Sequence, residues 1–197
     1  MSSESQVRPT LRRPRVERRR AATRDRIVVA AGRHFAAAGP DAVTLNQVAD
    51  AADVARGTLY SHFQTKDALL CAIVEPVLRL AIRKTSALGR LDARNGIDQL
   101  LGLYLDLWRD HPDALRIAYR AQDIPVGDLG TLHRAFLTAV LRVFKKADHA
   151  GILRSGDPVL AGHVMRQVAV PLLELYGRHP GGNRLFVEGL RGLLLRE

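Results

Sequence analysis

Residues 56–62, RGTLYSH, bring a guanidinium, two hydroxyls, a phenol and an imidazole together within two helical turns. All of these groups donate hydrogen bonds, and the guanidinium carries a fixed positive charge. Arginine pairs with guanine in a bidentate manner, hydroxyls and phenols reach phosphate oxygens, and glycine lets another molecule approach the backbone. The chemistry that this stretch favours is therefore binding to a polar, anionic partner.

Two short helices with a tight turn between them are expected to hold this stretch. Thr44 and Gln47 have the spacing of a capping box, which predicts a helix start at Thr44. A turn at residues 53–54 ends that helix, and the next helix begins near Arg56. Two short helices joined in this way match the helix-turn-helix motif, whose second helix enters the major groove of DNA while the first crosses the backbone.

A longer helix is expected on each side of this pair. Apolar residues at every third and fourth position predict a first helix from Thr23 to the Gly-Pro stop at residues 39–40. Thr65 can cap a fourth helix that runs to about Leu88. Pro76 interrupts this helix, and its bend is either a neutral kink or a means of transmitting ligand binding to the DNA-binding unit.

The inward and outward faces of the helix that begins at Arg56 follow from its period. Leu59 and Phe63 face the core, and the other side chains are left for the groove and its phosphate walls. The starts of the neighbouring helices, at Thr44 and Lys66, add two further anion contacts. The predicted DNA-binding residues are Thr44, Arg56, Gly57, Thr58, Tyr60, Ser61, His62 and Lys66.

Residues 23–70 resemble the DNA-binding domain of the TetR family of transcriptional regulators. The matching residues are Phe35, Gly39, Thr44, Val48, Ala49, Val54, Gly57, Thr58, Leu59, Tyr60, His62, Phe63, Lys66 and Leu69. The resemblance implies an all-helical homodimer that binds a palindromic operator, usually as a repressor released by a small ligand held in a C-terminal domain. Two positions depart from the family pattern: Asp53 replaces a common glycine, and Ala55 replaces a serine that often contacts phosphate. Aspartate still tolerates the left-handed turn conformation, so the fold is expected to persist.

Positive charge is concentrated at the N-terminus. The chain of 197 residues has a net charge of +10, and residues 1–26 carry nine arginines against three acidic residues. Residues 1–22 lack a hydrophobic period and are predicted to be a disordered basic arm. The arm could be a solubilising tail or could lie in the minor groove of DNA. On charge alone, a basic helical protein that coats nucleic acid or anionic membrane nonspecifically is the alternative function.

The rest of the chain predicts an all-α body. We expect a helix-turn-helix DNA-binding domain at residues 23–66 and a helical ligand-binding and dimerisation domain at 67–197. Further helices are expected at about 97–109, 112–120, 129–150, 158–176 and 183–195. Aromatic and histidine side chains in the body are able to line an apolar pocket, although such residues are more often ordinary core. The foremost ligand-binding candidates are Tyr104, Trp108 and His133.

Several classes of protein find no support in the sequence. Motifs for a phosphate loop, a nucleophile elbow, a zinc protease or a dinucleotide fold are missing, so we expect no enzyme and no cofactor. The seven histidines lack paired helical spacing, and no metal site is expected. A single cysteine, the lack of a secretory signal and the lack of a long apolar run indicate a cytoplasmic protein with no membrane partner.

Overall fold

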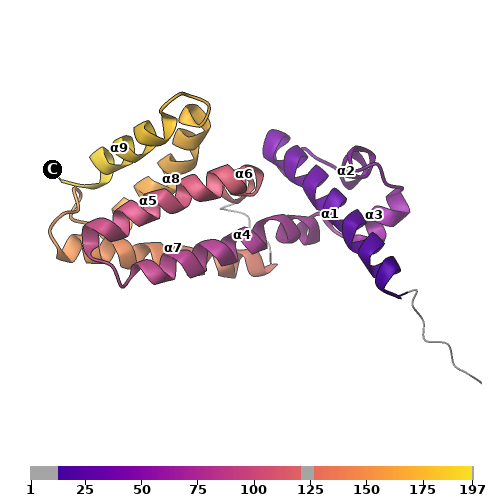
Figure 1. Cartoon of the computed structure of the whole chain (residues 1–197), viewed down its shortest axis with the longest axis horizontal. Coiled ribbons are helices and arrows are strands. Elements are labelled where there is room, and N and C mark those ends of the chain that lie inside the picture. The colour runs from indigo at the N-terminus through magenta and orange to yellow at the C-terminus, as the bar shows by residue number, and fades with distance from the viewer. Residues whose placement is uncertain (1–12, 121–126, 197) are drawn as a thin grey trace, which may run out of the picture.

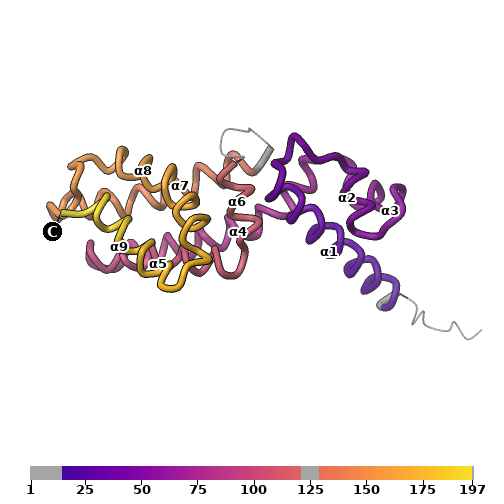
Figure 2. The backbone as a smooth tube through the Cα atoms, turned by 90° about the horizontal axis from the view of Figure 1, so that it is seen from above, coloured from indigo at the N-terminus to yellow at the C-terminus, as the bar shows by residue number. Residues whose placement is uncertain are grey.

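The computed structural model describes residues 13–120 and 127–196 and shows an all-helical protein, as predicted (Figure 1). A small unit of three helices lies at one end of the molecule and a helical bundle at the other (Figures 1 and 2). The small unit consists of α1 (Arg13–Ala38), α2 (Leu45–Ala51) and α3 (Arg56–His62). The connection to the bundle is α4 (Lys66–Leu88). The bundle adds α5 (Ala93–Asp110), α6 (Pro112–Arg120), α7 (Gly127–His149), α8 (Pro158–Tyr176) and α9 (Gly182–Leu194).

The small unit has an apolar core to which α1, α3 and the start of α4 all contribute, and α3 packs on α2. Ile27 and Phe35 of α1 are fully buried, as are Leu59 of α3 and Leu69 of α4. Burying side chains of this size stabilises the unit by about 1.5–3 kcal/mol for each residue. The predicted inward face of the third helix is therefore confirmed, and the polar residues of that helix are left on its outer side.

Helix α1 begins at Arg13, whereas the sequence pattern placed its start at Thr23. Arginine, glutamate and alanine are strong helix formers, and Pro14 lies in the first turn, where its missing amide does no harm. Residues 15–22 are exposed, so they lack the apolar period by which a helix start is recognised. Residues 13–22 of the arm predicted to be disordered are thus helical, and residues 1–12 lie outside the described residues.

The bundle is built around α4, which packs against α5 and α7, while α8 and α9 pack on one another at the outer side (Figure 1). Phe144 of α7 and Phe186 of α9 are fully buried within it. Helix α5 begins at Ala93, earlier than the predicted start at residue 97, because the Asp92 carboxylate accepts a hydrogen bond from the Asn95 amide at 3.0 Å and caps the helix. None of the described helices is long and apolar enough to cross a membrane.

The bundle and the small unit also meet through α6. Helix α6 packs on α1, and the Arg120 Nη1 donates to the carbonyl oxygen of Ala36 at 2.7 Å. Ala36 lies in the last turn of α1, where carbonyl groups have no helical partner. A charged donor from the bundle thus satisfies the end of the first helix of the small unit.

Candidate nucleic-acid interface

The turn between α2 and α3 is closed by backbone geometry. Asp53 has a φ of 51°, which confirms the expected left-handed conformation at this position. The Val54 amide donates to the Ala49 carbonyl at 3.1 Å, and an Arg26 guanidinium nitrogen lies 3.4 Å from the Asp53 carbonyl oxygen. These bonds fix the direction in which α3 leaves the turn.

The predicted capping box is present at the start of α2. The Thr44 hydroxyl accepts a hydrogen bond from the Gln47 amide at 3.3 Å, and the Gln47 side-chain oxygen accepts one from the Thr44 amide at 2.8 Å. Thr65 caps α4 in the same way, through the Ala68 amide at 3.1 Å. The helix starts on both sides of α3 are therefore defined by side-chain caps, while α3 itself has Ala55 as its N-cap residue and no side-chain cap.

Helix α3 lies at the end of the molecule farthest from the bundle in both views (Figures 1 and 2). Tyr60 is 46% exposed although it is a large aromatic residue. A Cβ added at Gly57 would meet no atom within 4 Å, so neither internal packing nor the backbone conformation requires glycine there. Arg56 and Ser61 are exposed as well, and Thr58 and His62 are partly buried. This face is therefore available to a partner.

Two of the predicted contact residues also have partners inside the protein. The Lys66 ammonium donates to the Pro40 carbonyl at 2.7 Å and ties the start of α4 to the turn that follows α1. The Ser61 hydroxyl donates to the Thr58 carbonyl at 2.7 Å within α3. An ammonium has three donors, so Lys66 keeps two for another acceptor.

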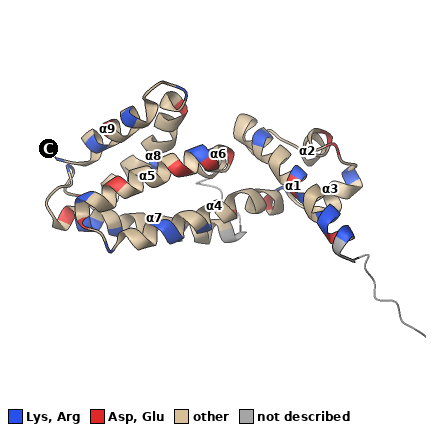
Figure 3. Ribbon diagram, viewed as in Figure 1, with Lys and Arg blue, Asp and Glu red and all other residues tan. Residues whose placement is uncertain are grey.

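Positive charge from α1 reaches the end of α3. Partial burial, followed by the charges of Arg20 and Arg24, lowers the pKa of His62 below its ordinary value of 6.5. The Arg24 guanidinium also lies 5.0 Å from the centre of the Phe63 ring. Figure 3 shows basic residues along the N-terminal half of α1, beside α3. The sequence pattern placed Arg20 in the arm and Arg24 at the start of the first helix, and it gave no sign that both lie near α3.

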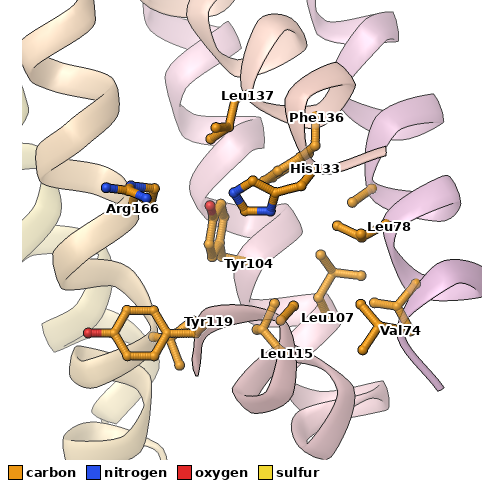
Figure 4. A pocket seen from close by; sticks show the side chains of 14 residues that line it. Val74, Leu78, Tyr104, Leu107, Leu115, Tyr119, His133, Phe136, Leu137 and Arg166 are labelled. Atoms are coloured by element: carbon orange, nitrogen blue, oxygen red, sulfur yellow. The ribbon is translucent and has the colours of Figure 1, made fainter. Parts of the chain in front are cut away.

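A half-open apolar cavity of about 60 Å³ lies in the bundle between α4, α5, α6, α7 and α8 (Figure 4). Its lining consists of Val74, Val77, Leu78, Ala81, Tyr104, Leu107, Leu115, Ala118, Tyr119, His133, Phe136, Leu137, Arg166 and Val170. In the view of Figure 4, Tyr104 lies between His133 and Arg166. Burial raises the pKa of the Tyr104 phenol, which keeps it neutral.

The structure brings together two of the three predicted ligand-binding residues. Tyr104 and His133 line this cavity, whereas Trp108 lies in a separate surface groove with the Arg116 guanidinium 4.4 Å from its ring centre. Sequence reasoning did not find Arg166. The sequence did contain a signal for Arg166. This charged residue lies three and four positions before Ala169 and Val170, so it shares a face of α8 with two buried apolar residues. Among the described residues, no group of three or more histidine, cysteine or acidic side chains could hold a metal ion.

The exposed α3, the tight turn before it and the helical body define a helix-turn-helix unit joined to a helical bundle. Comparison with known proteins shows which family this segment resembles. Residues 27–73 match the family model described as bacterial regulatory proteins, tetR family. The chain as a whole has the fold of TetR-family regulators, as the sequence resemblance predicted. No curated protein sequence matches the chain.

Three solved structures illustrate the shared fold. The ketosteroid transcriptional regulator KstR2 of Mycobacterium tuberculosis is 17% identical, with a TM-score of 0.72 over 88% of this chain and 95% of that one. A tetR-family regulatory protein from Rhodococcus RHA1 is 20% identical, with a TM-score of 0.72 over 89% and 98%. AibR, solved with isovaleryl coenzyme A and operator DNA, is 17% identical, with a TM-score of 0.72 over 87% and 97%. At these identities the likeness concerns the fold.

Proposed function

We propose that this protein is a transcriptional repressor that binds a palindromic operator as a homodimer and is released from it by a small ligand. The observation that carries the proposal is α3, a helix at the tip of the molecule whose polar face has a half-exposed Tyr60 and an open Gly57. Such a helix is suited to the major groove, where phenol, hydroxyl and guanidinium groups find phosphates and base edges. The residues proposed to contact DNA are those predicted from the sequence, including Lys66 through its two remaining donors.

A second copy of the chain is the proposed occupant of the outer face of α8 and α9. Large apolar side chains on these helices are exposed, and Leu175 is the most exposed at 69%. The others are Val159, Leu160, Leu185 and Leu193. Monomeric proteins seldom expose large contiguous apolar patches, and five large exposed apolar side chains on one helix pair favour a covering partner. A dimer would also supply the two α3 helices that a palindromic operator requires, whose half-sites lie one helical turn of DNA apart, about 34–36 Å, or a multiple of it.

The bundle cavity is the proposed ligand site. Its 60 Å³ corresponds to about two water molecules, whereas ligand pockets commonly have about 300 Å³ or more. The walls must therefore move when a ligand enters. Leu115, Ala118 and Tyr119 of α6 belong to the wall, and the next residue, Arg120, is bonded to the end of α1. Displacement of α6 would consequently act on the small unit, which supports ligand-driven release.

The AibR complex adds a precedent for both partner classes, because that protein was solved with an acyl coenzyme A and with operator DNA. It supports an operator and a small ligand as the two kinds of partner here. The chemistry of this cavity indicates a mainly apolar ligand whose few polar groups meet Tyr104, His133 and Arg166.

The experiment that tests DNA recognition is selection of bound duplexes from a random pool, followed by competition with excess unrelated DNA. A palindromic consensus that survives competition is expected. Tyr60→Ala should weaken binding to it by about tenfold or more, as expected for loss of a groove contact. Val29→Ala is the matched control, because Val29 is 52% exposed on α1 and lies outside α3. Recovery of no consensus, with binding lost on competition, would favour the nonspecific basic protein instead.

Two further measurements test the dimer and the ligand. Leu175→Glu should convert the dimer to a monomer in sedimentation analysis, whereas Val29→Glu, a similar change on the small unit, should leave it dimeric. A screen of small molecules for release of the selected duplex should then yield compounds that also raise the melting temperature of the free protein. A stable monomeric wild type would contradict the proposed dimer.

A further inference from the structure

The first turns of α1 carry an arginine surface on the face that elsewhere packs into the protein core. Arg20 precedes Ile27 by seven residues, and Arg24 precedes Ala31 by seven. Seven residues are close to two full helical turns, so these arginines lie on the same face as the fully buried Ile27 and Ala31. Where α1 extends beyond the core, its inward face thus changes from apolar to cationic.

This face lies beside the end of α3. The charges of Arg20 and Arg24 both act on His62, the last residue of α3, and Arg24 stacks on Phe63. Within the described part of the chain, neither arginine forms an ion pair with a carboxylate. The face, which also carries Glu17 seven residues before Arg24, thus presents two arginines outside ion pairs next to the proposed recognition helix.

The dimensions of this segment decide which part of DNA it fits. An α-helix with its side chains is about 10–12 Å wide. The minor groove of B-DNA is about 6 Å wide. Because residues 13–22 are helical, they cannot lie inside the minor groove in the way that an extended arm could. A rigid helix with arginines on one side is suited instead to the phosphate backbone at the edge of a groove.

We propose that Arg20 and Arg24 form a phosphate-binding face that contacts the DNA backbone next to the groove occupied by α3. This inference rests on the proposed function, and it adds a second DNA-contacting element to the helix-turn-helix. The contact is independent of base sequence, so it strengthens binding to every duplex and holds α3 in register at its site.

The test is the salt dependence of binding to the selected palindrome and to a duplex of unrelated sequence. Each lost phosphate contact lowers the slope of log K against log salt by about 0.9, so Arg20→Gln should lower it by about 1.8 for a dimer. Arg18→Gln is the matched control. Arg18 is exposed and precedes Ile27 by nine residues, which places it on the opposite side of the same helix.

The expected result is a lower slope for Arg20→Gln on both duplexes, an unchanged slope for Arg18→Gln and an unchanged circular dichroism spectrum for both. Ethylation interference should also show phosphates that are needed by the wild type and not by Arg20→Gln. Equal changes in the two variants would overturn the inference, because they would indicate only an effect of net charge. If the wild type binds its palindrome and Arg20→Gln shows the same salt slope as the wild type, the inference is also overturned. A wild type that binds no duplex would overturn the proposed function as well.

Discussion

The left-handed backbone at Asp53 allows a sharp test of how the turn holds α3. A residue with a side chain costs about 1–2 kcal/mol in this conformation, and glycine does not incur that cost. Glycine loses about 0.5–1 kcal/mol more backbone entropy on folding. The balance predicts that Asp53→Gly is more stable than Asp53→Ala by about 0.5–1 kcal/mol. Asp53 is exposed, and Arg26 bonds to its backbone oxygen, so that contact survives either change.

Urea unfolding of the two variants at one protein concentration provides the assay, because the stability of a dimer depends on concentration. With a slope of about 2 kcal/mol/M, the midpoints should differ by about 0.3–0.5 M. Asp53→Asn is the control for the lost charge, and it should match the wild type because asparagine tolerates the same backbone region. If Asp53→Ala were as stable as Asp53→Gly, the turn would not have the geometry described here.

Three other predictions concern single contacts. Lys66→Met should lower the free energy of unfolding by about 1–2 kcal/mol, because the hydrogen bond to the Pro40 carbonyl is lost. If Lys66 also contacts phosphate, the variant should show a lower salt slope of DNA binding, which a purely structural role would leave unchanged. Arg120→Met should cost about 1 kcal/mol in urea unfolding because the Ala36 carbonyl loses its donor. The pKa of His62 lies below 6.5 in the free protein, and the negative charge of DNA phosphates would raise it, so His62 should take up a proton on binding. DNA affinity should therefore rise as pH falls below about 6.5. The His62→Gln variant should lose this pH dependence.

The sign of the His62 effect on folding is opposite to its effect on binding. The folded pKa lies below the unfolded value, so protonation favours the unfolded chain, and the stability contributed by His62 is lost as pH falls through 6.5. Wild type and His62→Gln should therefore differ in stability only at the acidic end of a pH series. A stability difference that was constant from acid to alkaline pH would indicate a packing role instead.

Local signals in the sequence were enough to place most helices. The capping box at Thr44, the cap at Thr65 and the Asp-Pro pair at 157–158 act within a few residues, so their helix starts could be read directly. The helical period likewise determined that Leu59 would be buried. The helical period gave no sign of the helix at residues 13–22, because an exposed helix has no apolar stripe to mark its beginning.

The sequence by itself determined the fold class, the turn conformation at Asp53 and the polar face of α3, since each depends on neighbours within a few positions. Only the tertiary structure decided that Tyr104 and His133 share a cavity while Trp108 lies outside it. It also decided that Arg20 and Arg24 lie beside His62. Such proximities depend on how helices far apart in the chain pack together, and a periodic pattern specifies which face of a helix is buried but not which helix covers it.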